Sequence, residues 1–171
     1  MSKRLTARYI FLFISLAIMT YIFIMSAQTA TVSTQNSGRV IRKIATILVE
    51  GFEKKPAAYQ INFISSLQLL VRKAAHFIEF AALGFSVAGF VFTFEGKTVY
   101  KKSAIAFACA FLYAVSDEVH QLFVVGRSCQ ISDMLLDAVG VICGILFLNL
   151  AYVILLKLIK RAEDRRAKNE Q

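Results

Sequence analysis

Residues 132–156 read SDMLLDAVGVICGILFLNLAYVILL, and this stretch decides the class of fold. Its two charged residues, Asp133 and Asp137, lie near its start, and every later position is uncharged. A transmembrane helix needs about 20 predominantly apolar residues. The stretch therefore predicts a helix that crosses a bilayer and carries two carboxylates at one end.

Three other segments have the same apolar character, at residues 9–25, 74–94 and 103–125. The chain is 57% hydrophobic, and its apolar residues form long runs rather than periodic stripes. Such runs are typical of helices that face lipid. The sequence predicts an all-α membrane protein with about four transmembrane helices, in a single integral membrane domain over residues 1–171. A cleaved signal peptide is the alternative for the first run. Its length and the spans that follow it favour an uncleaved anchor.

Residues 28–73 have a different composition, and we expect them to form an external segment at the membrane interface. Residues 26–37 are small and polar, with Ser and Thr suited to capping a helix. Residues 39–52 then alternate basic and apolar positions in the way of an amphipathic helix, with apolar residues at Val40, Ile41, Ile44, Ile47 and Leu48. A second amphipathic piece is expected over residues 59–70.

The formal net charge is +9, and its distribution indicates topology rather than nucleic-acid binding. Lys and Arg gather at the ends of the apolar segments, whereas a nucleic-acid interface needs a folded basic surface. The N-terminal arm, the 95–102 loop and the C-terminal tail are all basic, and four spans place them on one side. The positive-inside rule makes that side cytoplasmic, so both termini are expected there. The 28–73 segment is also basic, which counts against this topology, although its charges can pair with lipid phosphates.

The sequence shows neither a disulfide framework nor a known metal-binding motif. Cys109, Cys129 and Cys143 are isolated and odd in number, which does not suit a disulfide framework. No zinc spacing such as Cys-x-x-Cys or HExxH is present, so we predict no metal site. A site formed by His, Asp and Glu stays open as a variant of an enzyme. The sequence identifies no cofactor.

The predicted topology gathers the polar residues of three spans at one depth, near the outer leaflet. Ionisable groups in a spanning helix cost roughly 2.5–3.5 kcal/mol each at the bilayer centre. So many in one place imply mutual pairing, access to water or a bound ligand. The residues are Arg72, His76 and Glu79 before and within the second span, Asp117, Glu118, His120 and Gln121 in the third, Arg127 in the following loop, and Asp133 and Asp137 in the fourth.

Helical spacing places many of these residues on shared faces. Arg72, His76 and Glu79 lie four and three positions apart, and Asp117, His120 and Gln121 share a face above Tyr113. Gly140 and Gly144 continue the stripe of Asp133 and Asp137 and permit close helix approach. We expect one polar cluster between the second, third and fourth spans.

Simpler roles remain open for several members. Glu118 points away from the Asp117 face and would reach the headgroup region. Arg127 would anchor a lipid phosphate, and Arg72 and Lys73 would extend to the surface. Asp133 would cap its helix, in competition with Ser132. Asp137 lies one turn deeper, which favours a functional or network role, while the His76–Glu79 pair would be either a structural ion pair or a proton-transfer pair.

These motifs resemble those of the VanZ-like family. The resemblance lies in RKAAHFIEF over residues 72–80, in SDEVHQLFVVGR over 116–127, in Ser132-Asp133 with Asp137 and Gly140, and in Ser26-Ala-Gln28 after the first span. It covers roughly residues 10–150, with valine before Gly126 where family members often carry proline. It implies a bacterial plasma-membrane protein, in a family named for a member linked to teicoplanin resistance, without a settled reaction.

Three functions remain open from the sequence. The first is a protein that binds lipid-linked cell-envelope precursors or lipoglycopeptides and contributes to glycopeptide resistance. Its binding residues would be Arg127, Gln121, Asp133, Asp137, His120 and Arg72, with membrane lipids as further partners and no nucleic acid. The second is an intramembrane enzyme that uses His76, Glu79, Asp117 and Glu118 in acid–base catalysis of a similar substrate. The third is a small transporter, which would need an oligomer.

Overall fold

The computed structural model describes residues 3–169, and this part of the chain contains helices and no strand. Four helices are long and apolar enough to cross a membrane, as the sequence predicts. They are α1 (Lys3–Ser26), α3 (Ala57–Phe92), α4 (Val99–Gln121) and α5 (Ile131–Asn169). The connection between α1 and α3 contains α2 (Ala30–Leu48) and the short 3₁₀ helix η1 (Phe52–Lys54). The protein is therefore an all-α membrane protein.

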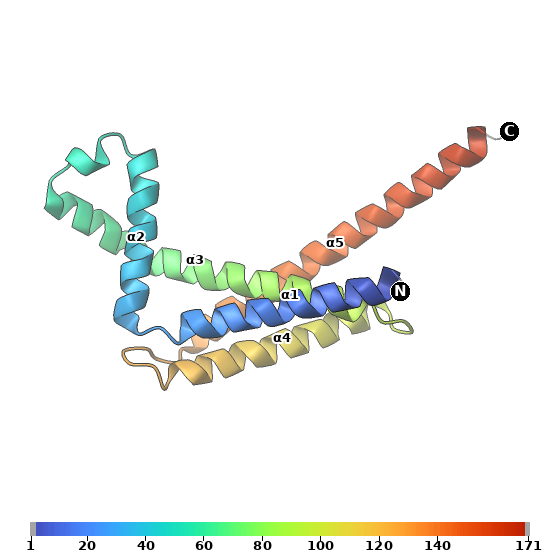
Figure 1. Ribbon diagram of the computed structural model, residues 1–171, viewed down its shortest axis with the longest axis horizontal. Helices are drawn as coiled ribbons and strands as arrows, with labels where there is room; N and C mark the ends of the chain where they lie inside the picture. The colour runs from blue at the N-terminus through green and yellow to red at the C-terminus, as the bar shows by residue number, and fades with distance from the viewer. Residues whose placement is uncertain (1–2, 170–171) are drawn as a thin grey trace.

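Helix α3 lies at the centre of the bundle and packs against α1, α4 and α5 (Figure 1). The packed interior is formed by large side chains of α1, α3 and α5 and by alanines four positions apart on α4. Its members are Ile22, Phe80, Leu83, Val141 and Ile145, with Ala88 of α3 and Ala106, Ala110 and Ala114 of α4. Small residues on α4 allow the helices to approach closely, which suits association within lipid.

The contact between α3 and α5 depends on glycine, as the sequence predicts. A Cβ atom on Gly140 would lie 2.6 Å from the carbonyl oxygen of Phe77, and one on Gly144 would overlap the carbonyl oxygen of Ala81. The two backbones are therefore in direct contact. Across the other side of the bundle, the Tyr113 hydroxyl of α4 donates to the Met19 carbonyl of α1 at 2.6 Å.

The segment between the first two spans differs in detail from the prediction. Helix α2 begins at Ala30, not near Arg39, because the Thr29 side chain accepts from the Val32 amide and starts the helix earlier. The second amphipathic piece and the second span form a single helix, α3, which is about 54 Å long for its 36 residues. No glycine or proline separates the two pieces. Figure 1 shows α2 lying across the end of the bundle.

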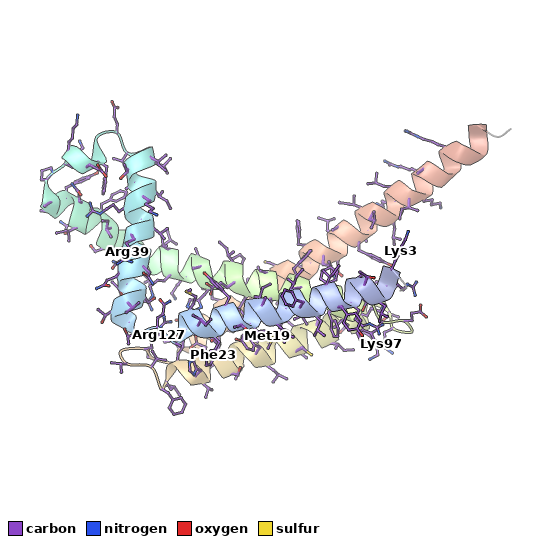
Figure 2. All side chains as sticks on the ribbon, viewed as in Figure 1. Lys3, Met19, Phe23, Arg39, Lys97 and Arg127 are labelled. Atoms are coloured by element: carbon purple, nitrogen blue, oxygen red, sulfur yellow. The ribbon has the colours of Figure 1, made fainter. Side chains whose placement is uncertain are left out.

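The two ends of the bundle differ in character. Figure 2 shows Phe23 and Arg127 at one end and Lys3 and Lys97 at the other. The first end, where α1 and α4 finish and α5 begins, is called the polar end below. At the opposite end, Arg4 pairs with Glu95.

Candidate functional site

The polar end combines the ends of α1 and α4, the middle of α3 and the start of α5. Helix α4 finishes at Gln121, before the predicted limit of 125, and Gly126 adopts a left-handed φ of 76° in the turn that follows. This turn directs Arg127 back toward α1. The site therefore involves α1 and α2 as well as the three spans that the sequence predicts.

Asp117 is the first buried carboxylate of the site, with only 3% of its surface exposed. Its Oδ2 atom accepts from the Ser26 hydroxyl at 2.8 Å and from the Gln121 side-chain amide at 3.0 Å. Ser26 is the last residue of α1, so this contact joins the ends of α1 and α4. From the sequence, Ser26 belonged to a small, polar stretch and to a family-like motif, and it was not expected in the polar cluster.

Glu118 is buried, which contradicts the expectation that it points toward the headgroups. Only 2% of its surface is exposed. Its Oε2 atom accepts from the Gln130 backbone N–H at 3.1 Å, and its Oε1 atom accepts from the Gln121 amide at 3.4 Å. Glu118 is buried because the chain that leads into α5 folds back over this side of α4. Glu118 thus ties the start of α5 to α4.

Arg127 holds the end of α1 in place, a role that the sequence did not indicate. Its Nε donates to the Gln28 carbonyl at 2.9 Å and its Nη2 to the Met25 carbonyl at 3.2 Å. Its Nη1 donates to the Gln121 side-chain oxygen at 3.3 Å. Carbonyls at the end of a helix lack partners in that helix and attract cations. Burial is the main cause that lowers the pKa of Arg127, and the positive charge of the neighbouring Arg72 lowers it further. The guanidinium nevertheless stays protonated.

The first turns of α5 carry two aspartates in different surroundings. Asp133 pairs with Lys73 of α3 at 3.1 Å, so Lys73 does not simply extend to the surface. The residue before α5 is Gln130, whose carbonyl accepts from the Asp133 amide, so neither Asp133 nor Ser132 occupies the capping position. Asp137 is fully buried, and neither of its carboxylate oxygens has a hydrogen-bond partner among residues 3–169.

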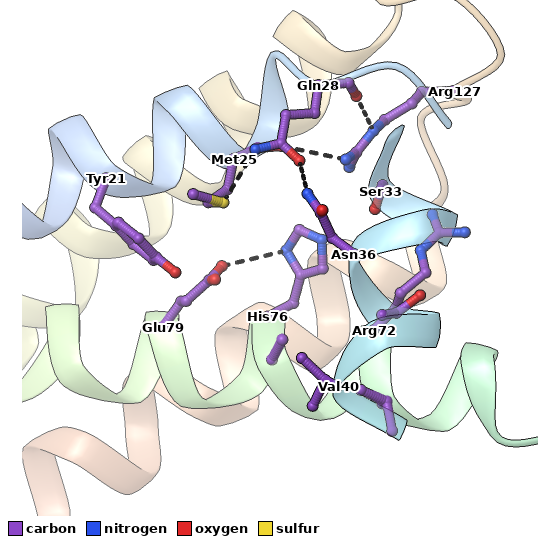
Figure 3. Close-up of a pocket in the computed structure, with 13 residues that line it drawn as sticks. Tyr21, Met25, Gln28, Ser33, Asn36, Val40, Arg72, His76, Glu79 and Arg127 are labelled. Atoms are coloured by element: carbon purple, nitrogen blue, oxygen red, sulfur yellow. Dashed lines mark hydrogen bonds and ion pairs between the residues drawn. The ribbon is translucent and has the colours of Figure 1, made fainter. Parts of the chain in front are cut away.

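His76 and Glu79 face a cavity of about 250 Å³ between α1, α2 and α3 (Figure 3). The His76 Nδ1 atom lies 4.0 Å from Glu79 Oε2, and it makes no hydrogen bond in the described part of the chain. Arg72 and Arg127 also border this cavity. Its other polar lining comes from Gln28, Ser33, Asn36 and Ser37, and its apolar lining from Tyr21, Met25, Val40, Val71 and Ala75.

A second cavity of about 190 Å³ lies between α3, the α4–α5 loop and α5. It borders Arg72, His76 and Arg127, as the first cavity does. Its own polar lining comes from Lys73, Gln121, Ser128, Gln130 and Asp133, with Leu69 and Leu136 as its only large apolar residues. These two spaces are called the first and second cavities below.

The structure divides the predicted residues into two groups. Six border a cavity: Arg72, His76, Glu79, Gln121, Arg127 and Asp133. Asp117, Glu118, His120 and Asp137 border neither. The His120 ring stacks on Phe23 of α1, with their ring centres 4.6 Å apart.

No three His, Cys, Asp or Glu side chains of residues 3–169 are grouped so that they could hold a metal ion. The three cysteines are free thiols. The arrangement can hold an anion beside two guanidiniums, with an imidazole and a carboxylate next to it.

Fold and site together define a multi-pass membrane protein with a polar cluster and cavity at one end of its helix bundle. A family model described as VanZ/LLP1 matches residues 11–157, which is most of the chain. The chain belongs to the VanZ/LLP1 family. No curated protein and no solved structure matches it.

Proposed function

We propose that this protein binds anionic, lipid-linked material of the bacterial cell envelope and contributes in this way to resistance against teicoplanin-type glycopeptides. The observation that carries the proposal is the pair of guanidiniums, Arg72 and Arg127, on the wall of the first cavity. Arginine recognises phosphate through charge and through its several N–H donors.

Both arginines keep the capacity to bind an anion. Arg127 has five N–H donors, and its three hydrogen bonds all go to neutral oxygens. Arg72 takes part in no hydrogen bond or ion pair of its side chain within residues 3–169, and no ion pair there includes Arg127. Two positive charges therefore face the cavity without a carboxylate partner within 4 Å. A bound phosphate would supply the missing counter-charge.

The lining of the first cavity also supports an amphiphilic ligand. Tyr21 and Val40 border it and are exposed, and Met25 and Val71 continue its apolar wall. A phosphate beside the arginines could therefore keep its lipid chain among apolar side chains. A soluble anion without an apolar chain would gain nothing from contact with that wall.

We further propose that the polar end faces outward from the plasma membrane. The basic N-terminal arm and Lys97 of the α3–α4 loop lie at the opposite end of the bundle (Figure 2), where α4 begins with Lys101 and Lys102 in its first turn. Helix α5 also extends toward that end (Figure 1). The positive-inside rule favours the cytoplasm for these segments. With the bundle upright in the bilayer, α2 lies along the outer surface, and its exposed Val40, Ile44 and Ile47 can enter the interface.

An intramembrane enzyme is the second candidate, and the His76–Glu79 pair favours it. The pair lies beside the two arginines, so it would adjoin a bound phosphate. In this role Glu79, rather than Asp117 or Glu118, is the partner of His76. Glu79→Gln would then abolish turnover of a phosphorylated lipid while leaving its binding intact. Loss of binding together with turnover would count against catalysis.

A susceptibility assay tests the cellular role. A glycopeptide-sensitive host would express the wild type, Arg72→Gln or the control Arg39→Gln at equal membrane levels, since Arg39 is exposed on α2 outside both cavities. We expect the wild type and the control to raise the inhibitory concentration of teicoplanin, and Arg72→Gln to leave it at the host's level. If no form changes susceptibility, the resistance role is wrong.

A further inference from the structure

The second cavity differs from the first in having few apolar walls. It borders the same arginine pair, and it has a volume of about 190 Å³. A group of this size attached to an arginine-bound phosphate would fit there. The chemistry of the walls decides what kind of group it is.

Apart from the arginine pair, the walls of the second cavity offer both donors and acceptors with little net charge. Lys73 and Asp133 neutralise one another, and each keeps hydrogen-bonding capacity beyond its 3.1 Å contact. The Gln130 side-chain amide donates to the Ser128 hydroxyl at 3.1 Å, and both residues are exposed. Mixed donors and acceptors of this kind suit hydroxyl groups, which act as both.

A cationic headgroup suits the second cavity poorly. Arg72, Arg127 and Lys73 border it, so an ammonium group would meet three positive charges and one carboxylate that is already paired. Like charges at short range repel. An apolar group fits no better, because the exposed polar walls would lose water without gaining partners.

We propose that the ligand is a phosphodiester lipid whose phosphate carries a neutral, hydroxyl-rich group. The phosphate lies between Arg72 and Arg127, the lipid chain lies along the first cavity, and the hydroxylated group occupies the second. This inference rests on the proposed function, because it uses the same arginine-bound phosphate. Glycosyl phosphoryl polyprenols and phosphatidylglycerol both have this chemistry.

The test compares charge-matched ligands on the purified full chain in phosphatidylcholine nanodiscs. Polyprenyl methyl phosphate and polyprenyl phosphoryl glucose carry the same charge and the same chain, and differ in the hydroxylated group. Two added hydrogen bonds predict about tenfold tighter binding of the glucosyl compound. A similar gain of phosphatidylglycerol over phosphatidylmethanol, which carries the same charge, would identify bulk lipid as a source. The absence of that gain would restrict the ligand to polyprenyl compounds.

Substitutions locate the effect in the second cavity. Ser128→Ala with Gln130→Ala should remove the tenfold gain and leave the affinity for polyprenyl methyl phosphate unchanged. The control, Gln35→Ala with Ser65→Ala, changes exposed residues that border neither cavity and should keep the gain.

Two negative results have separate meanings. Equal affinity of the wild type for the methyl and glucosyl compounds would overturn the inference and leave phosphate binding intact. Equal affinity for polyprenyl methyl phosphate and for unphosphorylated polyprenol would overturn the proposed function itself, and this inference with it.

Discussion

Gly144→Ala should destabilise the bundle by separating α3 from α5. The new Cβ would overlap the Ala81 carbonyl oxygen and lie 2.8 Å from the Phe85 amide nitrogen. Real Cβ atoms essentially never lie closer than 3.0 Å to such neighbours. The obstacle is the backbone of α3, which cannot rotate away as a side chain could, so the whole helix must shift.

The magnitude follows from two opposing effects. Overpacking a well-packed contact costs about 1–3 kcal/mol of unfolding free energy. We expect a cost near the upper end of this range here, because the new Cβ meets backbone atoms that cannot move aside. Replacing a helical glycine by alanine stabilises the helix itself by about 1 kcal/mol. The net loss is therefore about 2 kcal/mol of unfolding free energy, which corresponds to a fall of roughly 4–8 °C in Tm for a chain of this length.

Thermal unfolding followed by far-ultraviolet circular dichroism in one detergent measures this shift. Gly38→Ala is the matched control, because a Cβ there would meet its nearest atoms at 3.4 and 3.5 Å, which is ordinary contact. We expect the control to keep or slightly raise Tm. If Gly144→Ala and Gly38→Ala both melt like the wild type, the direct backbone contact between α3 and α5 is wrong.

Three other substitutions test the connections at the polar end by the same melting assay. Ser26→Ala removes a 2.8 Å donor from buried Asp117 and should cost about 1–2 kcal/mol; an unchanged Tm would contradict the α1–α4 connection. Arg127→Lys keeps the charge but cannot reach all three oxygens, so we expect a loss of about 2 kcal/mol and faster proteolysis after α1. The Lys73–Asp133 pair is partly exposed, and a double-mutant cycle should give a coupling below about 1 kcal/mol; a larger value would mean that it is effectively buried.

The sequence could predict the four spans because hydropathy is a local property of each segment. It also placed Gly140 and Gly144 correctly against a neighbouring helix, since glycines on the face of two aspartates indicate close approach. The continuity of α3 was predictable as well: no glycine or proline lies between residues 59 and 83. The change from amphipathic to fully apolar composition suggested two separate helices, but the structure has one continuous helix there.

The contacts of the site were harder to predict because they depend on backbone atoms and on chain reversal. Arg127 binds backbone carbonyls at the end of α1. Every residue has such a carbonyl, so the pattern of side chains cannot show which of them Arg127 binds. Glu118 is buried by the segment that leads into α5, so its helical face alone could not reveal its surroundings. The helical face of a residue reveals its surroundings only when all neighbours of the helix are known.

The most direct test of the central claim is the affinity of the purified chain in nanodiscs for polyprenyl phosphate relative to unphosphorylated polyprenol. Charge-assisted hydrogen bonds from two arginines predict a preference for the phosphate of more than tenfold in the wild type and in Arg39→Gln. The preference should be largely lost in Arg72→Gln, because this variant lacks one of the two guanidiniums that bind the phosphate. The loss would reflect binding rather than folding, because the Arg72 side chain makes no hydrogen bond or ion pair within residues 3–169. Equal affinity of the wild type for the two lipids, or an unchanged preference in Arg72→Gln, would contradict the account.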